Sequence, residues 1–171
     1  MRTRTLRAAL AGICGLCLSA VGACVVAEEI AVIVSSATPP PRMDARLLRD
    51  IYLKKIFLDD TGRKFIPVNL PAEHPLRSPL SDSLFGMSSD ALQDYWNQRY
   101  FHGVTPPYVL GSQDAVLRFV AKTPGAIGYV APCFLDASVR RILSLPVPPG
   151  VVLDWSAQCP RAADETPASR P

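Results

Sequence analysis

The sequence predicts an α/β fold in which helices flank a mixed or mostly parallel sheet of about four or five strands. Two continuous apolar runs, 30–34 and 126–130, have the composition of strands buried on both faces of such a sheet. Between them, apolar residues recur at helical spacing behind residues that cap helices. Strand and helix patterns therefore alternate along the chain, which favours a layered α/β sandwich.

The first strand and the first helix are separated by a stiff connector. Polar residues bound the apolar run 30–34, and Pro39–Pro41 follow it. Asp44 has the position of an N-cap, and the apolar spacing after it predicts a helix that runs to about Lys55.

A turn and a second strand come next. Asp59-Asp60-Thr61-Gly62 predicts a turn, and 65–68 a strand whose Pro67 places it at a sheet edge or at a strand end. The segment 73–85 is predicted to be helical, because Pro75 and Pro79 are tolerated only within or near a first turn.

Two further helices and a final strand complete the pattern. Ser88 or Ser89 caps a helix rich in aromatic residues, which we expect to lie in the core, and Ser112 caps the next helix. Gly128, inside the run 126–130, marks a close approach to the strand, and 141–145 is predicted as the last strand.

The N-terminus has the layout of a secretory signal peptide. A basic start is followed by an almost uncharged apolar run that ends in small residues, which predicts cleavage after Ala27. Cleavage after Ala23 is the alternative and would leave Cys24 for lipidation, and an uncleaved membrane anchor is a third reading. We therefore expect a periplasmic or secreted protein, or a lipoprotein anchored through Cys24. Residues 28–159 would form one domain, and 160–171 a disordered tail.

Charge gives no indication of a nucleic-acid partner. The chain has 18 Lys+Arg against 15 Asp+Glu. Arg2, Arg4 and Arg7 lie in the leader, so the processed protein is close to neutral. Net charge therefore does not support binding to nucleic acid or to an anionic membrane.

The cysteines favour one disulfide. Of the 5 Cys, only Cys133 and Cys159 lie beyond the leader, and an even pair in an oxidising compartment can form a lasting bridge. Two free buried thiols are the alternative.

Catalytic and metal-binding motifs are missing from the sequence after the leader. It has no Gly-x-Ser-x-Gly element and no phosphate-binding Gly-x-x-x-x-Gly-Lys loop, and its 2 His are far apart. Asp59-Asp60 fits a turn better than an acid/base pair. We expect no enzyme activity, no metal and no cofactor.

Two segments carry a family resemblance. Leu47-Leu48-Arg49-Asp50-Ile51-Tyr52-Leu53-Lys54-Lys55-Ile56-Phe57 and Thr123-Pro124-Gly125-Ala126-Ile127-Gly128-Tyr129-Val130 resemble the phosphate-binding proteins of bacterial ABC transporters. That family carries an "L-x-x-I-[FY]-L-G-K" helix, a later "P-G-A-I-G-Y-V" segment and a Trp-containing helix between them. The order and spacing fit from about Ala31 to Leu145.

The resemblance implies a periplasmic-binding-protein-like lobe. Family members clamp phosphate between two lobes, and this chain is long enough for about one. The family holds the anion with an Arg and a Ser-Gly-Thr at a helix N-terminus, and the corresponding stretch here offers Arg77, Ser78 and His74 as ligand-binding candidates.

Two functions follow from the resemblance as hypotheses. The chain binds phosphate or a related small anion for transport or sensing, alone or with a partner that supplies the other wall. Alternatively, it is a non-enzymatic interaction module that docks on the periplasmic face of a membrane transporter or sensor. A homodimer of two facing lobes would rebuild a clamp.

Overall fold

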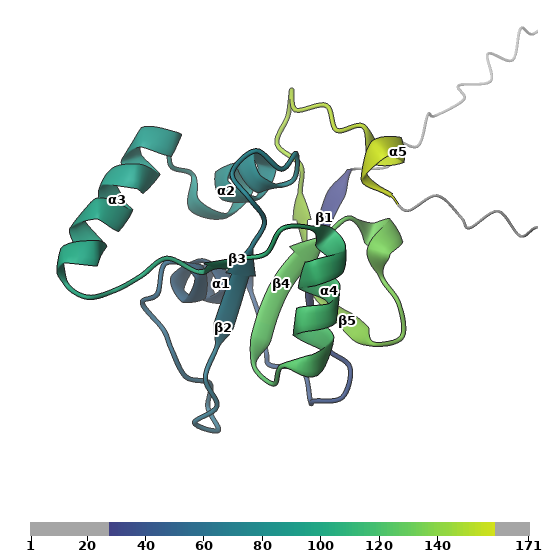
Figure 1. The fold of residues 1–171 in the computed structure, drawn as a ribbon, viewed down its shortest axis with the longest axis horizontal. Helices are drawn as coiled ribbons and strands as arrows, with labels where there is room; N and C mark the ends of the chain where they lie inside the picture. Colours follow the sequence, from purple (N-terminus) through teal and green to yellow (C-terminus); the bar gives the residue numbers. More distant parts are fainter. Residues whose placement is uncertain (1–27, 160–171) are drawn as a thin grey trace, which may run out of the picture.

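The computed structural model describes residues 28–159, which form a five-stranded sheet with helices around it (Figure 1). The predicted leader 1–27, with Cys24, and the predicted tail 160–171 lie outside the described residues. The strands are β1 (Glu29–Ser35), β2 (Ile66–Asn69), β3 (Tyr108–Val109), β4 (Ala126–Val130) and β5 (Val139–Pro146). The helices are α1 (Ala45–Tyr52), α2 (Arg77–Phe85), α3 (Ser89–Phe101), α4 (Gln113–Lys122) and α5 (Trp155–Gln158), and Pro132–Phe134 forms a 3-10 turn.

The sheet is mixed, with one strand opposed to the rest. Its order is β3-β2-β4-β1-β5. Strand β2 runs parallel to β3 and β4, whereas β1 runs antiparallel to β4 and β5, so β1 alone points the other way. The predicted α/β class is confirmed, and the five-stranded mixed sheet agrees with the prediction of a mixed or mostly parallel sheet of about four or five strands.

Helices cover both faces of the sheet. A Cβ placed on Gly128 of β4 would lie 2.5 Å from Val116 Cγ1 and 3.0 Å from Val120 Cγ2, so α4 packs directly on this strand. On the other face, the ring of Tyr52 from α1 lies 6.5 Å from the ring of Tyr129, and α2 packs beside α1. Because both faces are covered, every residue of the apolar run 30–34 is buried.

Side-chain caps set the predicted helix starts. Asp44 Oδ1 accepts a hydrogen bond from the backbone N–H of Leu47 at 2.7 Å. The hydroxyl oxygens of Ser88 and Ser112 accept N–H groups three residues further on, each at 3.2 Å. Each cap satisfies a donor that the first turn of a helix leaves free.

The position of β2 contradicts one of the two alternatives predicted from its proline. The strand is not at the sheet edge, because it lies between β3 and β4, but Pro67 is the second of its 4 residues and so lies near the start of the strand. Strand β3, however, pairs only with Val68 and Asn69. Pro67 pairs with β4 and lies before the part of β2 that pairs with β3. The missing N–H of Pro67 therefore removes no hydrogen bond between β2 and β3.

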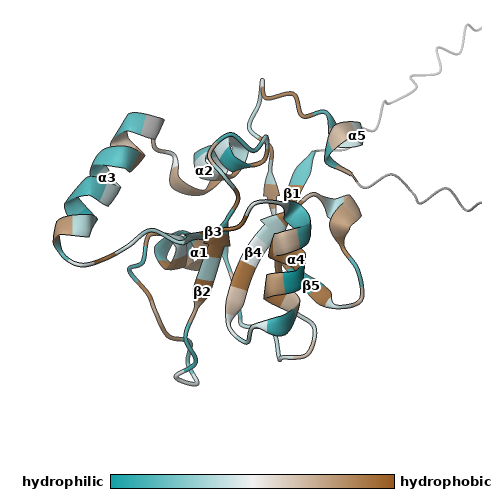
Figure 2. Cartoon of the chain, viewed as in Figure 1, coloured by the Kyte–Doolittle hydropathy of each residue, from teal (hydrophilic) through white to brown (hydrophobic). Residues whose placement is uncertain are grey.

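The aromatic residues of α3 do not form core as expected. Tyr95 and Trp96 are half-buried, and Tyr100 and Phe101 are 67% and 86% exposed. Helix α3 projects from the rest of the chain, mostly polar along its length and apolar at its C-terminal end (Figures 1 and 2). Its apolar positions therefore touch the body of the protein on a narrow strip only.

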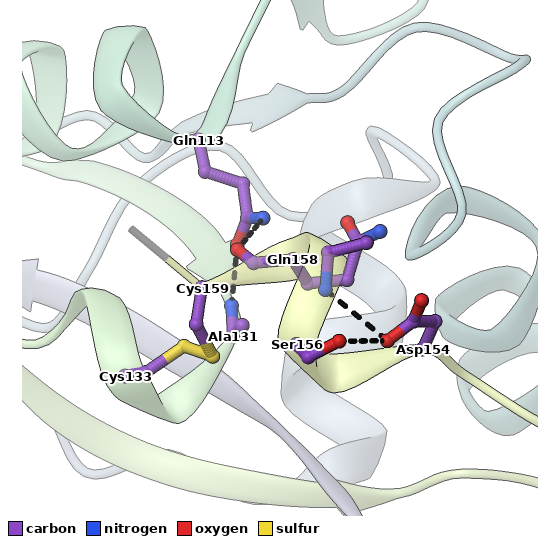
Figure 3. The surroundings of a disulfide bond; sticks show 8 residues. Gln113, Ala131, Cys133, Asp154, Ser156, Gln158 and Cys159 are labelled. Atoms are coloured by element: carbon purple, nitrogen blue, oxygen red, sulfur yellow. Dashed lines mark hydrogen bonds between the residues drawn. A yellow bond between two sulfur atoms is a disulfide. The ribbon is translucent and has the colours of Figure 1, made fainter. Parts of the chain in front are cut away.

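The C-terminal segment is fastened to the sheet by a disulfide. Cys133 and Cys159 form this bond, as predicted (Figure 3). Next to it, the buried Gln113 accepts the N–H of Ala131 at 2.6 Å and donates to the carbonyl of Gln158 at 3.1 Å. The covalent bond and the amide together hold α5 near the start of α4.

Replacing Gly128 with Ala should lower the free energy of unfolding by about 1 to 3 kcal/mol, because the new methyl group would overlap Val116. Urea unfolding measures this loss. Gly111→Ala is the matched control, since no atom lies within 4 Å of a Cβ there and its effect should stay within about 0.5 kcal/mol. Equal losses in the two variants would contradict the close packing of α4.

Replacing both Cys133 and Cys159 with Ser should lower the free energy of unfolding by about 3 kcal/mol, because the bridge spans 26 residues and restricts the unfolded chain. Urea unfolding of the oxidised protein, the reduced protein and the double variant checks this. The reduced protein and the variant should unfold at the same urea concentration. An unchanged midpoint in both would contradict the prediction.

Candidate anion-binding site

The chain between β2 and α2 folds into two consecutive turns. The N–H of His74 donates to the carbonyl of Pro71 at 3.0 Å, and the N–H of Arg77 donates to the carbonyl of His74 at 2.8 Å. The Nδ1 atom of His74 accepts the N–H of Leu76 at 3.2 Å. The backbone donors of Leu76 and Arg77 are thus already used within the chain, and Pro75 has none.

Arg77 is the first residue of α2 and carries a charge without a counterion. Its Nη1 atom is buried and has no hydrogen-bond partner among the described residues. The three ion pairs among residues 28–159 join other side chains: Lys55 with Asp50, Arg63 with Asp59, and Arg141 with Glu29. A guanidinium in such surroundings favours an anionic ligand that forms charge-assisted hydrogen bonds.

Two buried tyrosines lie beside this guanidinium. Tyr52 donates to the carbonyl of Val68 at 3.0 Å, and Tyr129 accepts the N–H of Leu70 at 3.1 Å. Burial raises the pKa of Tyr52 well above its usual value, Tyr129 raises it further, and the positive charge of Arg77 opposes the rise. Burial also raises the pKa of Tyr129, and the charge of Arg77 together with hydrogen bonds from the Leu70 N–H and the Arg77 side chain opposes this rise. Both hydroxyls therefore stay protonated and neutral.

A hollow of about 230 Å³ lies between α2 and α3. Its wall includes Arg77, Ser78 and Asp82 of α2 and Gln93 and Trp96 of α3. The hydroxyl of Ser78 lies 3.3 Å from Asp82 Oδ2 and donates to it. The hollow thus offers a ligand the guanidinium of Arg77, the hydroxyl of Ser78 and the amide of Gln93. The carboxylate of Asp82 disfavours a ligand that carries much negative charge.

The structure brings together two of the three predicted ligand-binding residues. Arg77 and Ser78 line the same hollow, whereas the Nδ1 atom of the third, His74, is occupied by its own backbone turn. Tyr52 and Tyr129 are not among the predicted site residues, because the sequence patterns place them only in a helix and a strand. It also missed Asp82, although its position four residues after Ser78 on a helix was a usable signal.

Asp59, the first residue of the predicted turn, lies outside the hollow at Arg77. The carboxylate of Asp59 accepts hydrogen bonds from Thr61 and Arg63, of which the Thr61 hydroxyl has the largest effect, and these hold its pKa at about 2. It therefore fixes a turn. Within residues 28–159, no group of three or more His, Cys, Asp or Glu side chains is placed to hold a metal ion. No helix in that range has the length and apolar character needed to cross a bilayer.

The fold is similar to that of phosphate-transport proteins. It matches an ABC-type phosphate transport receptor from Vibrio cholerae at 21% identity and a TM-score of 0.56, over 67% of this chain and 45% of the receptor. A putative phosphate ABC transporter substrate-binding protein with bound phosphate from Clostridium perfringens matches at 18% identity and a TM-score of 0.54, over 68% of this chain and 45% of that protein. No protein-family model and no curated protein matches the sequence.

These similarities show a shared fold. They support, at the level of fold, the resemblance inferred from the motifs. The chain spans less than half the length of the structures it matches. Both matched proteins are described by their role in transport or substrate binding, and neither as an enzyme.

The protein should lose stability as the pH falls from about 7.5 to 5, and His74 should contribute to this loss. Burial lowers the pKa of His74 below its usual 6.5, so the unfolded chain takes up a proton at a higher pH than the folded chain does. His74→Asn keeps an acceptor for the Leu76 N–H and removes the titration. Urea unfolding across this range should therefore show a smaller acid-linked loss in the variant, and parallel pH curves would contradict the prediction.

Proposed function

We propose that this protein is a solute-binding-like protein, exported from the cytoplasm, that binds phosphate or a related small oxyanion at Arg77. The observation that carries the proposal is the guanidinium of Arg77. This residue lines the hollow between α2 and α3, it forms no ion pair among the described residues, and its buried Nη1 atom has no hydrogen-bond partner there. The fold similarity to phosphate-transport proteins supports the same chemistry.

The chemistry of the hollow favours a singly charged or hydrogen-bonding oxyanion. Arg77 supplies the charge-assisted donors, and Ser78 and Gln93 supply neutral polar groups from the two helices. A protonated phosphate oxygen would donate a hydrogen bond to the carboxylate of Asp82. A fully ionised phosphate has no such proton and would be repelled by this carboxylate. The site would then prefer a ligand that keeps one proton.

In this proposal the second wall of the site is supplied from outside the described residues. The chain covers 45% of each of the two phosphate-transport proteins that it matches, and the family that it resembles clamps phosphate between two lobes. A partner on the periplasmic face of a membrane transporter or sensor, or a second copy of the chain, would supply this wall and raise the affinity.

Export is part of the proposal. The leader 1–27 and the lipidation alternative at Cys24 are sequence predictions. The bond between Cys133 and Cys159 fits an oxidising compartment, where such bonds persist.

A specific observation favours the second candidate, a non-enzymatic interaction module. The N–H groups of Leu76 and Arg77 are already bonded to His74, and Pro75 and Pro79 lack one. The start of α2 is therefore poor in the backbone donors that hold anions at helix N-termini. In that case the lobe is kept as a scaffold for protein docking.

A thermal melt of the protein with and without millimolar phosphate tests the first candidate. Phosphate at about 100 times its dissociation constant should add about 2.7 kcal/mol of stability, seen as a shift of several degrees in Tm. Arg77→Ala should abolish the shift. Arg118→Ala removes an equal charge from an exposed position on α4 and should leave it intact.

Sodium chloride at matched ionic strength controls for screening. A wild-type protein that shows no phosphate-dependent shift, alone or with a crosslinked partner, excludes useful phosphate binding. The interaction module then remains.

A further inference from the structure

A second surface, apart from the hollow at Arg77, has an apolar floor and a basic rim. A groove of about 510 Å³ runs between the turn after α1, the start of β2 and the edge strand β3. Phe57, Leu58 and Tyr108 line it and are 51%, 51% and 68% exposed. Lys54 and Lys64 complete the rim. So much exposed apolar side chain in one groove is typical of a binding surface.

Lys54 adopts a backbone conformation that normally favours glycine. Its φ is 54°, in the left-handed region, and it is the only non-glycine residue with positive φ among residues 28–159. The "L-x-x-I-[FY]-L-G-K" motif that this helix resembles has Gly in this place. A side chain that persists at a strained position is a sign of a function for that side chain.

Helix α3 holds this strained turn in place. The hydroxyl of Tyr95 donates to the carbonyl of Leu53 at 2.6 Å, and Arg99 Nη2 donates to the carbonyl of Lys54 at 3.3 Å. The turn is thereby fixed, and the Lys54 side chain is presented at the groove.

The groove carries positive charge that nothing in the described residues neutralises. Its lining includes two lysines and no carboxylate, and the ion pair of this region joins Asp50 to Lys55. Burial lowers the pKa of the Lys54 ammonium, because part of its hydration is lost without a compensating anion. A second copy of this chain, docked groove to groove, would place lysines against lysines. The complement is an apolar group flanked by carboxylates.

We propose that this groove binds a segment of a partner protein in which apolar side chains are flanked by acidic ones. The apolar residues cover Phe57, Leu58 and Tyr108, and the carboxylates pair with Lys54 and Lys64. This docking does not depend on anion binding at Arg77, because the two sites share no lining residue.

Backbone NMR of the isotopically labelled full chain, secreted from a bacterial host, tests the proposal with two synthetic peptides. One has Phe-Leu between pairs of Glu, and the other has the same Phe-Leu between pairs of Lys. The acidic peptide should shift amide signals of residues 54–66 and 108–109 in a saturable way, and the basic peptide should not. Lys64→Glu should weaken the acidic peptide at least tenfold, while Lys122→Glu, the same charge change on an exposed residue of α4, should leave it unchanged.

Lys54→Gly separates a binding role from a structural one. Glycine relieves the strained φ, so the variant should raise Tm while weakening the acidic peptide severalfold. If Lys54 has only a structural role, the variant should have a higher Tm and unchanged affinity for the acidic peptide. Loss of stability in Lys54→Gly, with peptide affinity unchanged, would overturn the argument from strain.

Three results overturn the proposed partner. The first is the absence of shifts with millimolar acidic peptide. The second is equal binding of both peptides. The third is a dimer in light scattering whose interface includes Tyr108, which would assign the groove to a second copy. The phosphate melt uses Arg77→Ala and this titration uses Lys64→Glu, so either proposal can fail while the other stands.

Discussion

Two buried tyrosine hydroxyls replace the backbone ladder at the place where β2 and β4 separate. These parallel strands pair only at Ile66 with Ala126 and at Pro67 with Ile127. Beyond that point the carbonyl of Val68 and the N–H of Leu70 bond to tyrosine hydroxyls instead. Tyr52 donates to the carbonyl of Val68, and Tyr129 accepts the N–H of Leu70. Because an unpaired buried amide or carbonyl destabilises by about 1 to 3 kcal/mol, the strands can part here only with these hydroxyls in place.

Helix α2 begins at Arg77, after two turns that follow the end of β2. After Leu70 the chain turns away through Pro71 and His74, and the first residue of the helix, Arg77, reaches back toward the tyrosine pair. Neutral hydroxyls can face a guanidinium but do not neutralise it. The tyrosines that complete the hydrogen bonding of the core thus lie beside a guanidinium that forms no ion pair among the described residues, and this cation is the reason for placing an anion there.

Local signals predicted much of the fold, and contacts between distant residues account for what was missed. Asp44, Ser88 and Ser112 cap helices because their side chains reach donors three residues away, which a sequence displays directly. Whether Tyr100 is buried depends on how far α3 lies from the sheet. The spacing of apolar residues along the helix does not give this distance. At the site, Arg77 and Ser78 are neighbours in sequence and could be found together. Tyr52 joins them only through packing of α1 across the sheet.

The end of α1 links the two proposed binding surfaces. Its last residue, Tyr52, points inward to the core beside Arg77, and two residues later Lys54 turns outward at the groove. The formal net charge of the whole chain is only +3, so long-range attraction selects neither ligand. Selectivity has to come from cations that have no carboxylate partner and are held in fixed places. Arg77 lies beside two neutral hydroxyls and lines the hollow, which suits a small oxyanion. Lys54 and Lys64 border exposed aromatic and aliphatic side chains, which suits an acidic and apolar segment.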